Sequence, residues 1–430
     1  MRLAIWLLAL FAFAAALALG LSQQVGTVTV FVPPYRVDLS LNLVLMGLTA
    51  FFALLYAALR GMASFWVLPQ QARRWRLQQR ERSAQAHLLN AQIGWVTGRY
   101  LRSRKAALQG LSHVEELLSI EDAGPQKNSL ALMRSVLHML AAESAHVLRD
   151  EKARDEHVQQ LFQPHQGLSG SLRTEVQDAA RLSAARWALH DRDERSAHQF
   201  LSQLPLGTAR RTLALRLRLK ADRLGLMHLP ALDTARLLAK HGAFSSTAAI
   251  SLMRGLAMAG IDDCRDAHQL QATWRLFQAT EKAMPEVAAH AAKRLLGFHG
   301  DAGLALQWLL PVWEALSQPT DERSDNPVRH RFTEVLAQAL QNLTPDSEWL
   351  ARVEQSRLAN PRSVELQYLS GMLCLRHSLW GKASQLLEQA APRLPSSELK
   401  RSAWRALAEL AEQKGDQAQA LACWKLSASA

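Results

Sequence analysis

Two long apolar stretches separated by a short polar connector make up most of the first sixty residues. Leu3–Leu21 contains 19 residues, all of them Leu, Ala, Phe, Ile, Trp or Gly, and Leu39–Leu59 contains 21 residues with few polar members. Each would reach about 30 Å as an α-helix, which matches the hydrocarbon thickness of a bilayer. The pattern predicts a transmembrane hairpin over residues 1–60. Ala18–Gly20 also resembles a signal-peptidase site, but the apolar run is long for a signal peptide, so we expect an uncleaved helix.

The connector, residues 22–38, changes to a period of two. Val28, Val30 and Val32 alternate with other residues, Pro33 and Pro34 follow, and the alternation resumes at Val37. This pattern predicts a small β-ribbon on the periplasmic side, and a plain loop is the alternative.

Basic residues gather directly after the second apolar stretch. Of the net charge of +12, +9 falls between Arg60 and Lys105, where ten basic residues accompany one acid, Glu81. Basic residues beside a spanning helix mark its cytoplasmic end and bind anionic lipid headgroups. We therefore favour headgroup binding over nucleic-acid binding or a solvated charged face, and we expect the rest of the chain to be cytoplasmic. The residues assigned to the membrane surface are Arg60, Arg73, Arg74, Arg76, Arg80 and Arg82.

Residues 61–88 are predicted to form a basic, amphipathic juxtamembrane helix. Phe65 and Trp66 lie where an interfacial aromatic belt is expected. Pro69 predicts either a break in the helix or the point where it leaves the membrane. We expect this stretch to lie along the inner leaflet before the chain enters the next domain.

Beyond residue 88 the chain is rich in helix-forming residues and repeats itself. Its last two units follow the tetratricopeptide pattern, with bulky residues on the first helix, small residues where two helices cross, Gly in the turn, and Ala and an aromatic on the second helix. The residues predicted to pack in these units are Gly371, Trp380, Ala383, Leu387, Ala390, Pro395, Trp404, Leu407, Ala408, Ala411, Gly415, Ala420 and Trp424. Because stacked helix pairs form a solenoid with a concave face, the sequence predicts an all-α fold.

Weaker copies of the same unit occur upstream, with turns at Gly98–Tyr100, Asp191–Asp193 and His299–Asp301. Residues 206–280 show the weakest signal. Prolines mark the joints between hairpins, and Gln318–His330, which is polar and contains two prolines, predicts a break between an N-terminal array at 89–317 and C-terminal repeats at 328–430. The prolines at these joints are Pro164, Pro205, Pro230, Pro285, Pro319 and Pro327.

Catalytic motifs are absent from the sequence. It contains no dinucleotide-binding fingerprint, phosphate-binding loop, HExxH or GxSxG motif, and its three cysteines, Cys264, Cys374 and Cys423, have no metal-ligand spacing. Of the fifteen histidines, His138 and His146 are eight apart and His290 and His299 flank a turn, so neither pair has the i, i+4 spacing of helical metal ligands. We therefore predict no enzymatic activity, no metal and no cofactor.

The connector carries the pattern G-x-V-x-V-x₄-Y-x-V-x-x-S through Gly26, Val28, Val30, Tyr35, Val37 and Ser40. Together with the apolar hairpin, the Arg-rich exit and the repeats around Gly371–Pro395 and Trp404–Trp424, it resembles the proteobacterial HemY family, inner-membrane proteins linked to haem biosynthesis. The resemblance implies a multi-pass protein of the bacterial inner membrane with both termini and the repeat domain in the cytoplasm.

The resemblance also implies a role in late protohaem synthesis. Our main hypothesis is a non-catalytic scaffold whose repeats hold haem-pathway proteins, or other membrane-associated proteins, beside the membrane. The alternatives are a carrier or regulator that binds haem or another porphyrin directly through His and Arg in the groove, and a general membrane-protein assembly factor that binds peptides there.

Overall fold

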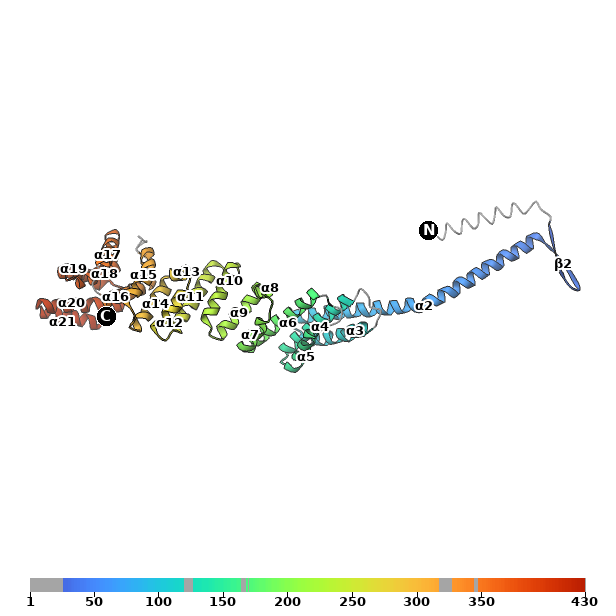
Figure 1. Ribbon diagram of the computed structural model, residues 1–430, viewed down its shortest axis with the longest axis horizontal. Coiled ribbons are helices and arrows are strands. Elements are labelled where there is room, and N and C mark those ends of the chain that lie inside the picture. Colours follow the sequence, from blue (N-terminus) through green and yellow to red (C-terminus); the bar gives the residue numbers. More distant parts are fainter. Residues whose placement is uncertain are drawn as a thin grey trace. The chain divides into compact units, whose positions relative to one another are not determined.

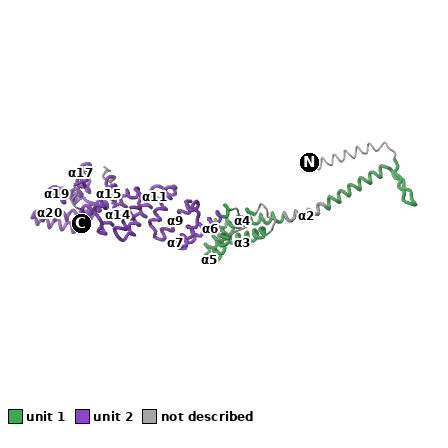
Figure 2. The backbone as a smooth tube through the Cα atoms, viewed as in Figure 1, with its two compact units in different colours: residues 1–173 green, residues 174–430 purple. Residues whose placement is uncertain are grey.

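The computed structural model describes residues 26–119, 127–163, 168, 170–316, 327–343 and 347–429, without the side chains of 63–74 and 315–316. The first predicted membrane helix, Leu3–Leu21, lies outside these residues. The chain divides into two compact units, residues 1–173 and 174–430 (Figure 2). In the described part, everything except one two-stranded hairpin is helix and connecting turn, so the all-α class is confirmed.

Unit 1 begins with the β-ribbon that the alternating valines predicted. Strands β1 (Thr27–Val32) and β2 (Tyr35–Ser40) pair antiparallel, with Val28 opposite Leu39 and Val30 opposite Val37. The backbone N–H of Leu41 donates to the carbonyl of Gly26 at 2.9 Å, which closes the ribbon against the start of the next helix. The loop alternative is therefore not found.

Helix α2 (Leu41–Val96) follows directly and contains 56 residues (Figure 1). At 1.5 Å per residue it is about 84 Å long. It continues through Pro69, so the helix break considered there is not found, whereas an exit from the membrane at Pro69 is compatible with an unbroken helix. Such a helix does not both cross a bilayer and lie flat on its surface, so residues 61–88 are expected to rise away from the membrane.

The C-terminal part of α2 packs with α3 (Tyr100–Leu118), α4 (Lys127–Val147) and α5 (Glu151–Phe162). Small residues bring α2 and α3 close together: Ser103 Oγ donates to the carbonyl of Ala91 at 2.7 Å. A Cβ on Gly94 would lie only 3.0 Å from the backbone nitrogen of Ser103. Ala84, Ala91 and Leu137 are fully buried in this core.

Unit 2 is built from helix pairs, and the unit boundary falls within α6 (Gly170–His190). The helices that follow are α7 (Glu194–Ser202), α8 (Leu206–Ala209), α9 (Thr212–Leu224), α10 (His228–Lys240), α11 (Ser246–Asp262), α12 (Ala267–Leu276), α13 (Ala279–Lys282), α14 (Pro285–Gly297), α15 (Ala302–Leu316), α16 (Pro327–Asn342), α17 (Ser347–Ala359), α18 (Val364–Arg376), α19 (Trp380–Ala390), the 3₁₀ turn η1 (Ala391–Arg393), α20 (Ser397–Lys414) and α21 (Gln417–Ser429).

Alternate helices of unit 2 form a continuous layer. Helix α14 contacts α16, α16 contacts α18 and α18 contacts α20, while α15, α19 and α21 each pack on a neighbour in sequence. This is the arrangement of a helical-repeat solenoid, in which each pair buries its apolar face on the next. One buried cluster accordingly runs from Leu215 to Cys423.

A single turn geometry recurs in both units. In eight described turns one residue has positive φ, and the next N–H donates to the carbonyl five residues earlier, as when Asp416 donates to Ala411 at 3.0 Å. This is the Schellman ending of a helix. The residues with positive φ are Gly98, Arg149, Arg192, Leu226, Gly242, His299, Ser378 and Gly415. Gly98, Arg192 and His299 occupy turns that the sequence predicted.

The proline joints coincide with helix starts where they are described. Pro205 is the N-cap of α8, Pro230 lies in the first turn of α10, and Pro285 and Pro327 are the first residues of α14 and α16. Pro164, Pro319 and most of the predicted break at Gln318–His330 lie outside the described residues.

Candidate functional site

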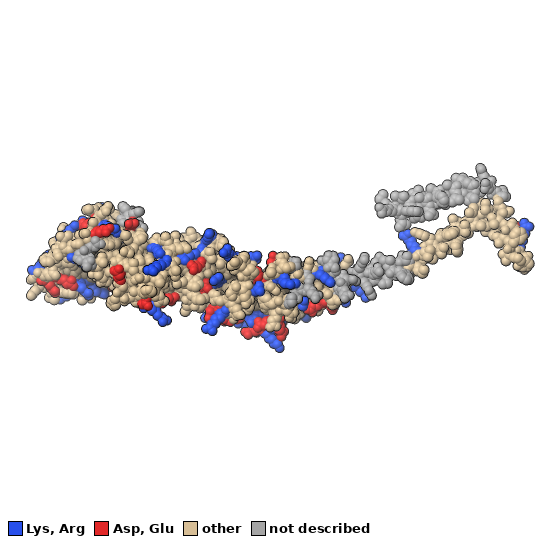
Figure 3. Space-filling model, viewed as in Figure 1, with Lys and Arg blue, Asp and Glu red and all other residues tan. Residues whose placement is uncertain are grey.

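The N-terminal part of α2 is the candidate membrane anchor. Among the described residues, Leu41–Met62 is the one helical segment long and apolar enough to cross a bilayer, and none of its most apolar window is buried against protein. Phe51, Leu54 and Tyr56 are each more than half exposed. Figure 3 shows an uncharged surface along this part of α2, whereas charges of both signs are scattered over the helices that follow.

Of the six arginines assigned to the membrane surface, Arg60 lies at the end of the apolar segment. Its Nη1 donates to the Tyr56 hydroxyl at 2.9 Å, one helical turn back. Arg73 and Arg74 lie in α2, but their side chains are outside the described set. Arg76, Arg80 and Arg82 are exposed, and Arg80 Nη1 lies 3.2 Å from Glu116 Oε2 on α3.

The helix rise separates these arginines by depth. Arg76 lies 14 residues beyond Met62 and Arg82 lies 20 residues beyond it, so they stand about 21 and about 30 Å further along the axis. Surface potentials decay over about 8 Å at physiological salt. Arg60 therefore has the position closest to a bilayer, and contact of Arg80 and Arg82 with headgroups would require α2 to tilt strongly.

The tip of the β-ribbon is apolar and exposed. Phe31 is 71% exposed and Tyr35 is 73% exposed, and the guanidinium of Arg36 lies 5.6 Å from the centre of the Phe31 ring. An aromatic pair with a neighbouring cation is typical of a membrane–water interface. The tip thus continues the apolar surface of the anchor.

The residues predicted to pack in the C-terminal repeats fall into two groups. Those that are buried include Gly371, where an added Cβ would lie 2.8 Å from Leu387 Cγ. Gly415 is exposed and forms the left-handed C-cap of α20. The others buried are Ala383, Leu387, Ala390, Leu407, Ala408, Ala411 and Ala420.

The remaining packing residues are exposed or partly buried. Trp404 is partly buried against the main cluster. Trp380 is half exposed and Pro395 is exposed. Trp424 is 37% exposed and its indole Nε1 donates to Glu412 Oε1 at 2.8 Å, joining α21 to α20.

Polar pairs connect the alternate helices of unit 2, a feature that the sequence pattern did not reveal. Helices α11 and α14 are joined twice, α16 and α18 once, and α18 and α20 once. The pairs are Arg254 Nη1–Glu286 Oε1 at 2.6 Å, Asp262 Oδ1–His290 Nε2 at 2.7 Å, His330 Nδ1–Glu365 Oε1 at 3.1 Å and Tyr368 OH–Ser402 Oγ at 3.0 Å. They fix the register of one repeat on the next.

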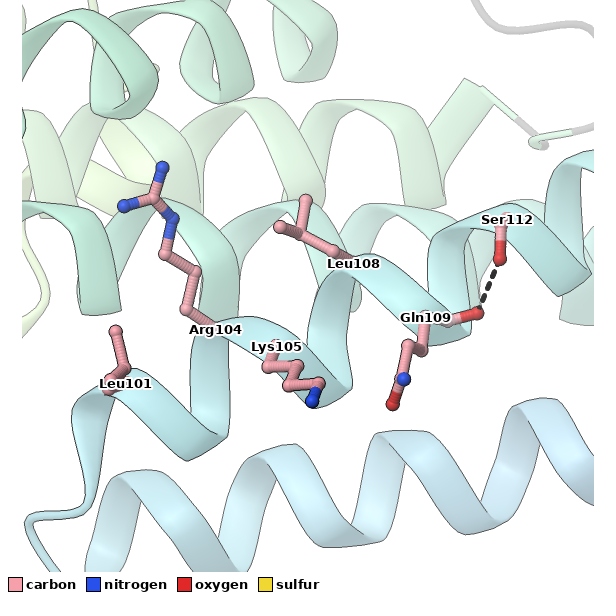
Figure 4. Close-up of a pocket in the computed structure, with 6 residues that line it drawn as sticks. All are labelled: Leu101, Arg104, Lys105, Leu108, Gln109 and Ser112. Carbon is pink, nitrogen blue, oxygen red and sulfur yellow. Dashed lines mark hydrogen bonds between the residues drawn. The ribbon is translucent and has the colours of Figure 1, made fainter.

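A groove lies along α3 in unit 1 (Figure 4). Its lining residues are spaced so that they share one face of the helix, and they border an open, shallow depression of about 630 Å³. They are Leu101, Arg104, Lys105, Leu108, Gln109 and Ser112. Leu101 is 72% exposed and Leu108 is 43% exposed. An apolar floor with basic groups beside it is suited to a partner segment that is apolar and acidic.

The electrostatics of the groove are set by α5. Arg104 Nη2 lies 2.9 Å from Asp150 Oδ2. A hydrogen bond from the backbone N–H of Ala153, followed by the bond from Arg104, holds the pKa of Asp150 below its usual value. Burial, aided by the charge of Arg104, lowers the pKa of His157, whose Nδ1 lies 3.1 Å from His138 Nδ1. Because Arg104 is already paired, Lys105 is the cation that this groove presents.

The three cysteines are free and buried. Burial raises the pKa of the Cys374 and Cys423 thiols, so both are held in the protonated, unreactive form.

Comparison with known proteins gives a family match for part of the chain. Residues 26–121 match the family model described as the HemY protein N-terminus, which covers the ribbon, α2 and α3. A search of curated proteins returns no match. Two solved structures of repeat proteins align with low similarity. The crystal structure of the P58(IPK) TPR domain is 14% identical over 78% of this chain and 99% of its own, with a TM-score of 0.23. Yeast Tom70 is 16% identical over 73% of this chain and 60% of its own, with a TM-score of 0.25.

Proposed function

We propose, from the premise that this chain is a HemY-family protein by its N-terminal domain, that it is a non-catalytic scaffold of the bacterial inner membrane. Its repeats would hold proteins of late haem synthesis at the cytoplasmic face. One observation carries the proposal: a single helix, α2, runs from an apolar segment of bilayer length directly into the helical array.

The physical basis of the mechanism is local concentration. A partner bound to an anchored array stays within a few tens of ångströms of the membrane, so its encounters with membrane-held substrates become effectively intramolecular. Such confinement commonly raises apparent affinity by about 10²–10⁴ without any new contact. Late tetrapyrrole intermediates are apolar, so a reaction sequence that passes them between enzymes benefits from keeping those enzymes at the bilayer.

For partner contact we propose the groove on α3. It combines exposed Leu101 and Leu108 with the cation of Lys105, and it lies within the matched family domain. An amphipathic partner helix with acidic residues would place its apolar side on the leucines and a carboxylate near Lys105.

Proximity labelling from the C-terminus in living cells tests the proposal. We expect the chain in the membrane fraction and haem-pathway enzymes among the labelled proteins. Replacing residues 1–62 with an unrelated span of the same orientation should preserve labelling, whereas removing them should reduce it, because the anchor acts only by position. Labelling of periplasmic proteins would overturn the proposed sidedness, and recovery of unrelated envelope proteins alone would favour the assembly-factor alternative.

The groove has its own matched pair of variants. Lys105→Glu reverses the charge that faces the groove, and we expect it to reduce labelling of the partner. Arg102→Glu makes the same change in charge at another exposed position on α3, outside the lining set, and should leave labelling unchanged. Equal effects of both substitutions would contradict a specific role for the groove.

A further inference from the structure

An exposed apolar stripe runs along the part of α2 that lies beyond the membrane segment. Trp75 is 64% exposed, Leu89 58%, Ile93 62% and Val96 77%. With three further positions these residues form a series whose members are separated alternately by four and three residues. The series is Trp75, Gln79, Arg82, Ala86, Leu89, Ile93 and Val96. This is the heptad spacing of a coiled-coil seam.

The stripe lies on the side of α2 opposite its own repeat partners. The fully buried Ala84 and Ala91 lie two residues before Ala86 and Ile93, so they are about 200° away around the helix. The face with Ala84 and Ala91 packs into the α3–α4 core, and the face with Ile93 has no described neighbour that buries it. Terminal helices of solenoids normally present a polar outer face to water, so an apolar one indicates a missing partner.

Lipid does not account for the stripe. Leu89 is 27 residues beyond Met62 and Val96 is 34 residues beyond it, so they lie about 40 and about 51 Å along the helix axis from the end of the apolar segment. A bilayer's headgroup layer is only about 5–8 Å thick on each side. The occupant must therefore be protein.

We infer that a second copy of this chain covers the stripe, with the two α2 helices in a parallel coiled coil over residues 75–96. Ile93 occupies an a position and Leu89 a d position, and a β-branched residue at a with Leu at d favours the two-stranded form. Both copies enter the membrane with the same polarity, so the anchor places identical residues at the same height, as an in-register parallel pair requires. This inference rests on the anchoring role of α2 proposed above.

The residues that flank the seam match a second copy. In a parallel pair each g position lies beside the e position of the other chain five residues later. The three pairs are Gln78 with Ser83, Gln85 with Asn90 and Gln92 with Thr97, and all are uncharged and able to hydrogen-bond. No like charges therefore meet in these pairs. Two seam positions are polar, Gln79 at a and Arg82 at d. Arg82 is the unfavourable one, because a parallel pair places its charge opposite the same charge of the second copy.

About three heptads would be marginal for two free peptides, because each would also have to form its helix. Here α2 is already folded against α3 and α4, and the membrane confines both copies to two dimensions. The entropy cost of forming the helix and of bringing the two copies together is therefore largely met before they associate. A short seam is then sufficient.

Cysteine cross-linking of the full chain in native membranes tests the inference. With a mild oxidant, Ile93→Cys and Leu89→Cys should give a disulfide-linked dimer at least about tenfold more than Val147→Cys. Val147 is 45% exposed at the end of α4, outside both the seam and the groove on α3, so it reports random collision. The native cysteines are buried and provide the unmodified control.

Two further variants should change the amount of dimer in opposite directions. The amount of dimer is measured by energy transfer between fluorescently labelled copies in vesicles. Ile93→Glu should abolish the dimer, and Arg82→Leu should increase it by removing the unfavourable residue. Membrane-embedded chain with no preference for cross-linking at Ile93 over Val147 would overturn the dimer, as would cross-links only to another protein. Chain recovered in the soluble fraction would instead overturn the anchor, so the two failures are distinguishable.

Discussion

Gly371 offers the sharpest test of how the C-terminal repeats pack. It lies in α18, and a Cβ placed on it would come within 2.8 and 2.9 Å of Leu387 Cγ and Cδ2 and within 3.4 Å of Leu386 Cβ. Distances below 3.0 Å require α18 and α19 to separate or the Leu387 side chain to leave its rotamer. Such overpacking typically costs about 1–3 kcal/mol.

The Gly371→Ala substitution also changes helix propensity. Replacing Gly with Ala inside a helix gains about 1 kcal/mol when nothing clashes. The net expectation for Gly371→Ala is therefore a loss of up to about 2 kcal/mol from the local stability of the α18–α19 pair. Gly381 is the matched control, because it lies on α19 with nothing within 4 Å of an added Cβ. Gly381→Ala should gain up to about 1 kcal/mol.

Hydrogen exchange of the full chain, resolved by peptide mass spectrometry, measures both changes, since helical-repeat arrays open locally. Amides of α18 and α19 should exchange up to about 30 times faster in Gly371→Ala, and should exchange more slowly in Gly381→Ala. If both variants protected α18 and α19 equally, the close approach of the two helices at Gly371 would be refuted.

Three further outcomes are expected. Leu226→Gly should stabilise the α9–α10 turn by about 1 kcal/mol in the same assay, because Leu226 is 71% exposed and holds φ of 54°, a strained region for any residue with a Cβ. Unchanged or faster exchange of the turn amides would count against the strain. Arg236→Ala should cost about 3–5 kcal/mol by leaving the fully buried Glu281 carboxylate without the guanidinium 2.7 Å away, and pairing it with Glu281→Leu should restore most of the loss in a thermal melt. Burial would raise the pKa of Glu354, but hydrogen bonds from Arg357, Ser370 and Lys382 outweigh it and lower the pKa from 4.5 to about 2. Stability of the α17–α19 region should therefore be full above pH 4.5 and fall as the pH drops towards about 2, and Glu354→Gln should flatten that dependence in urea titrations.

The parts of the fold that the sequence predicted are those with a strong local signal. The period of two at Val28, Val30 and Val37 predicted the β-ribbon, and the uncharged length of Leu39–Leu59 predicted a spanning segment. The continuity of α2 through Pro69 was not predicted, because proline is usually a helix terminator and the compensating context is not local.

Several repeat turns carry a weak sequence signal for a physical reason. Tetratricopeptide turns are usually identified by glycine, yet Arg149, Arg192, Leu226, His299 and Ser378 adopt the left-handed conformation at the corresponding turns. Packing of the helices on either side outweighs the local strain of about 1–2 kcal/mol. The backbone repeat is thus retained where its sequence marker is lost.

The candidate site was predicted less completely than the fold. Charge and position led us to assign six arginines between Arg60 and Arg82 to the membrane surface, and that assignment stays a prediction. The groove on α3 and the polar pairs between alternate helices depend on which side of each helix is covered. Leu101 and Ile93 look like core residues in the sequence and are exposed in the structure. A helical period shows that two faces differ, and only the neighbouring helices determine which of them meets water.

In the proposed membrane orientation, the unbroken course of α2 fixes by residue count how far helices α3–α5 of unit 1 lie from the bilayer. Each residue deleted at 63–74 would bring these helices about 1.5 Å closer to the bilayer and rotate them by about 100° around the axis of α2. The distance of these helices from the bilayer and the direction that they face therefore change together. A deletion of seven residues would bring them about 10 Å nearer the lipid while nearly preserving that direction. Insertions and deletions of other lengths would rotate the groove on α3 so that it faces a different direction parallel to the membrane.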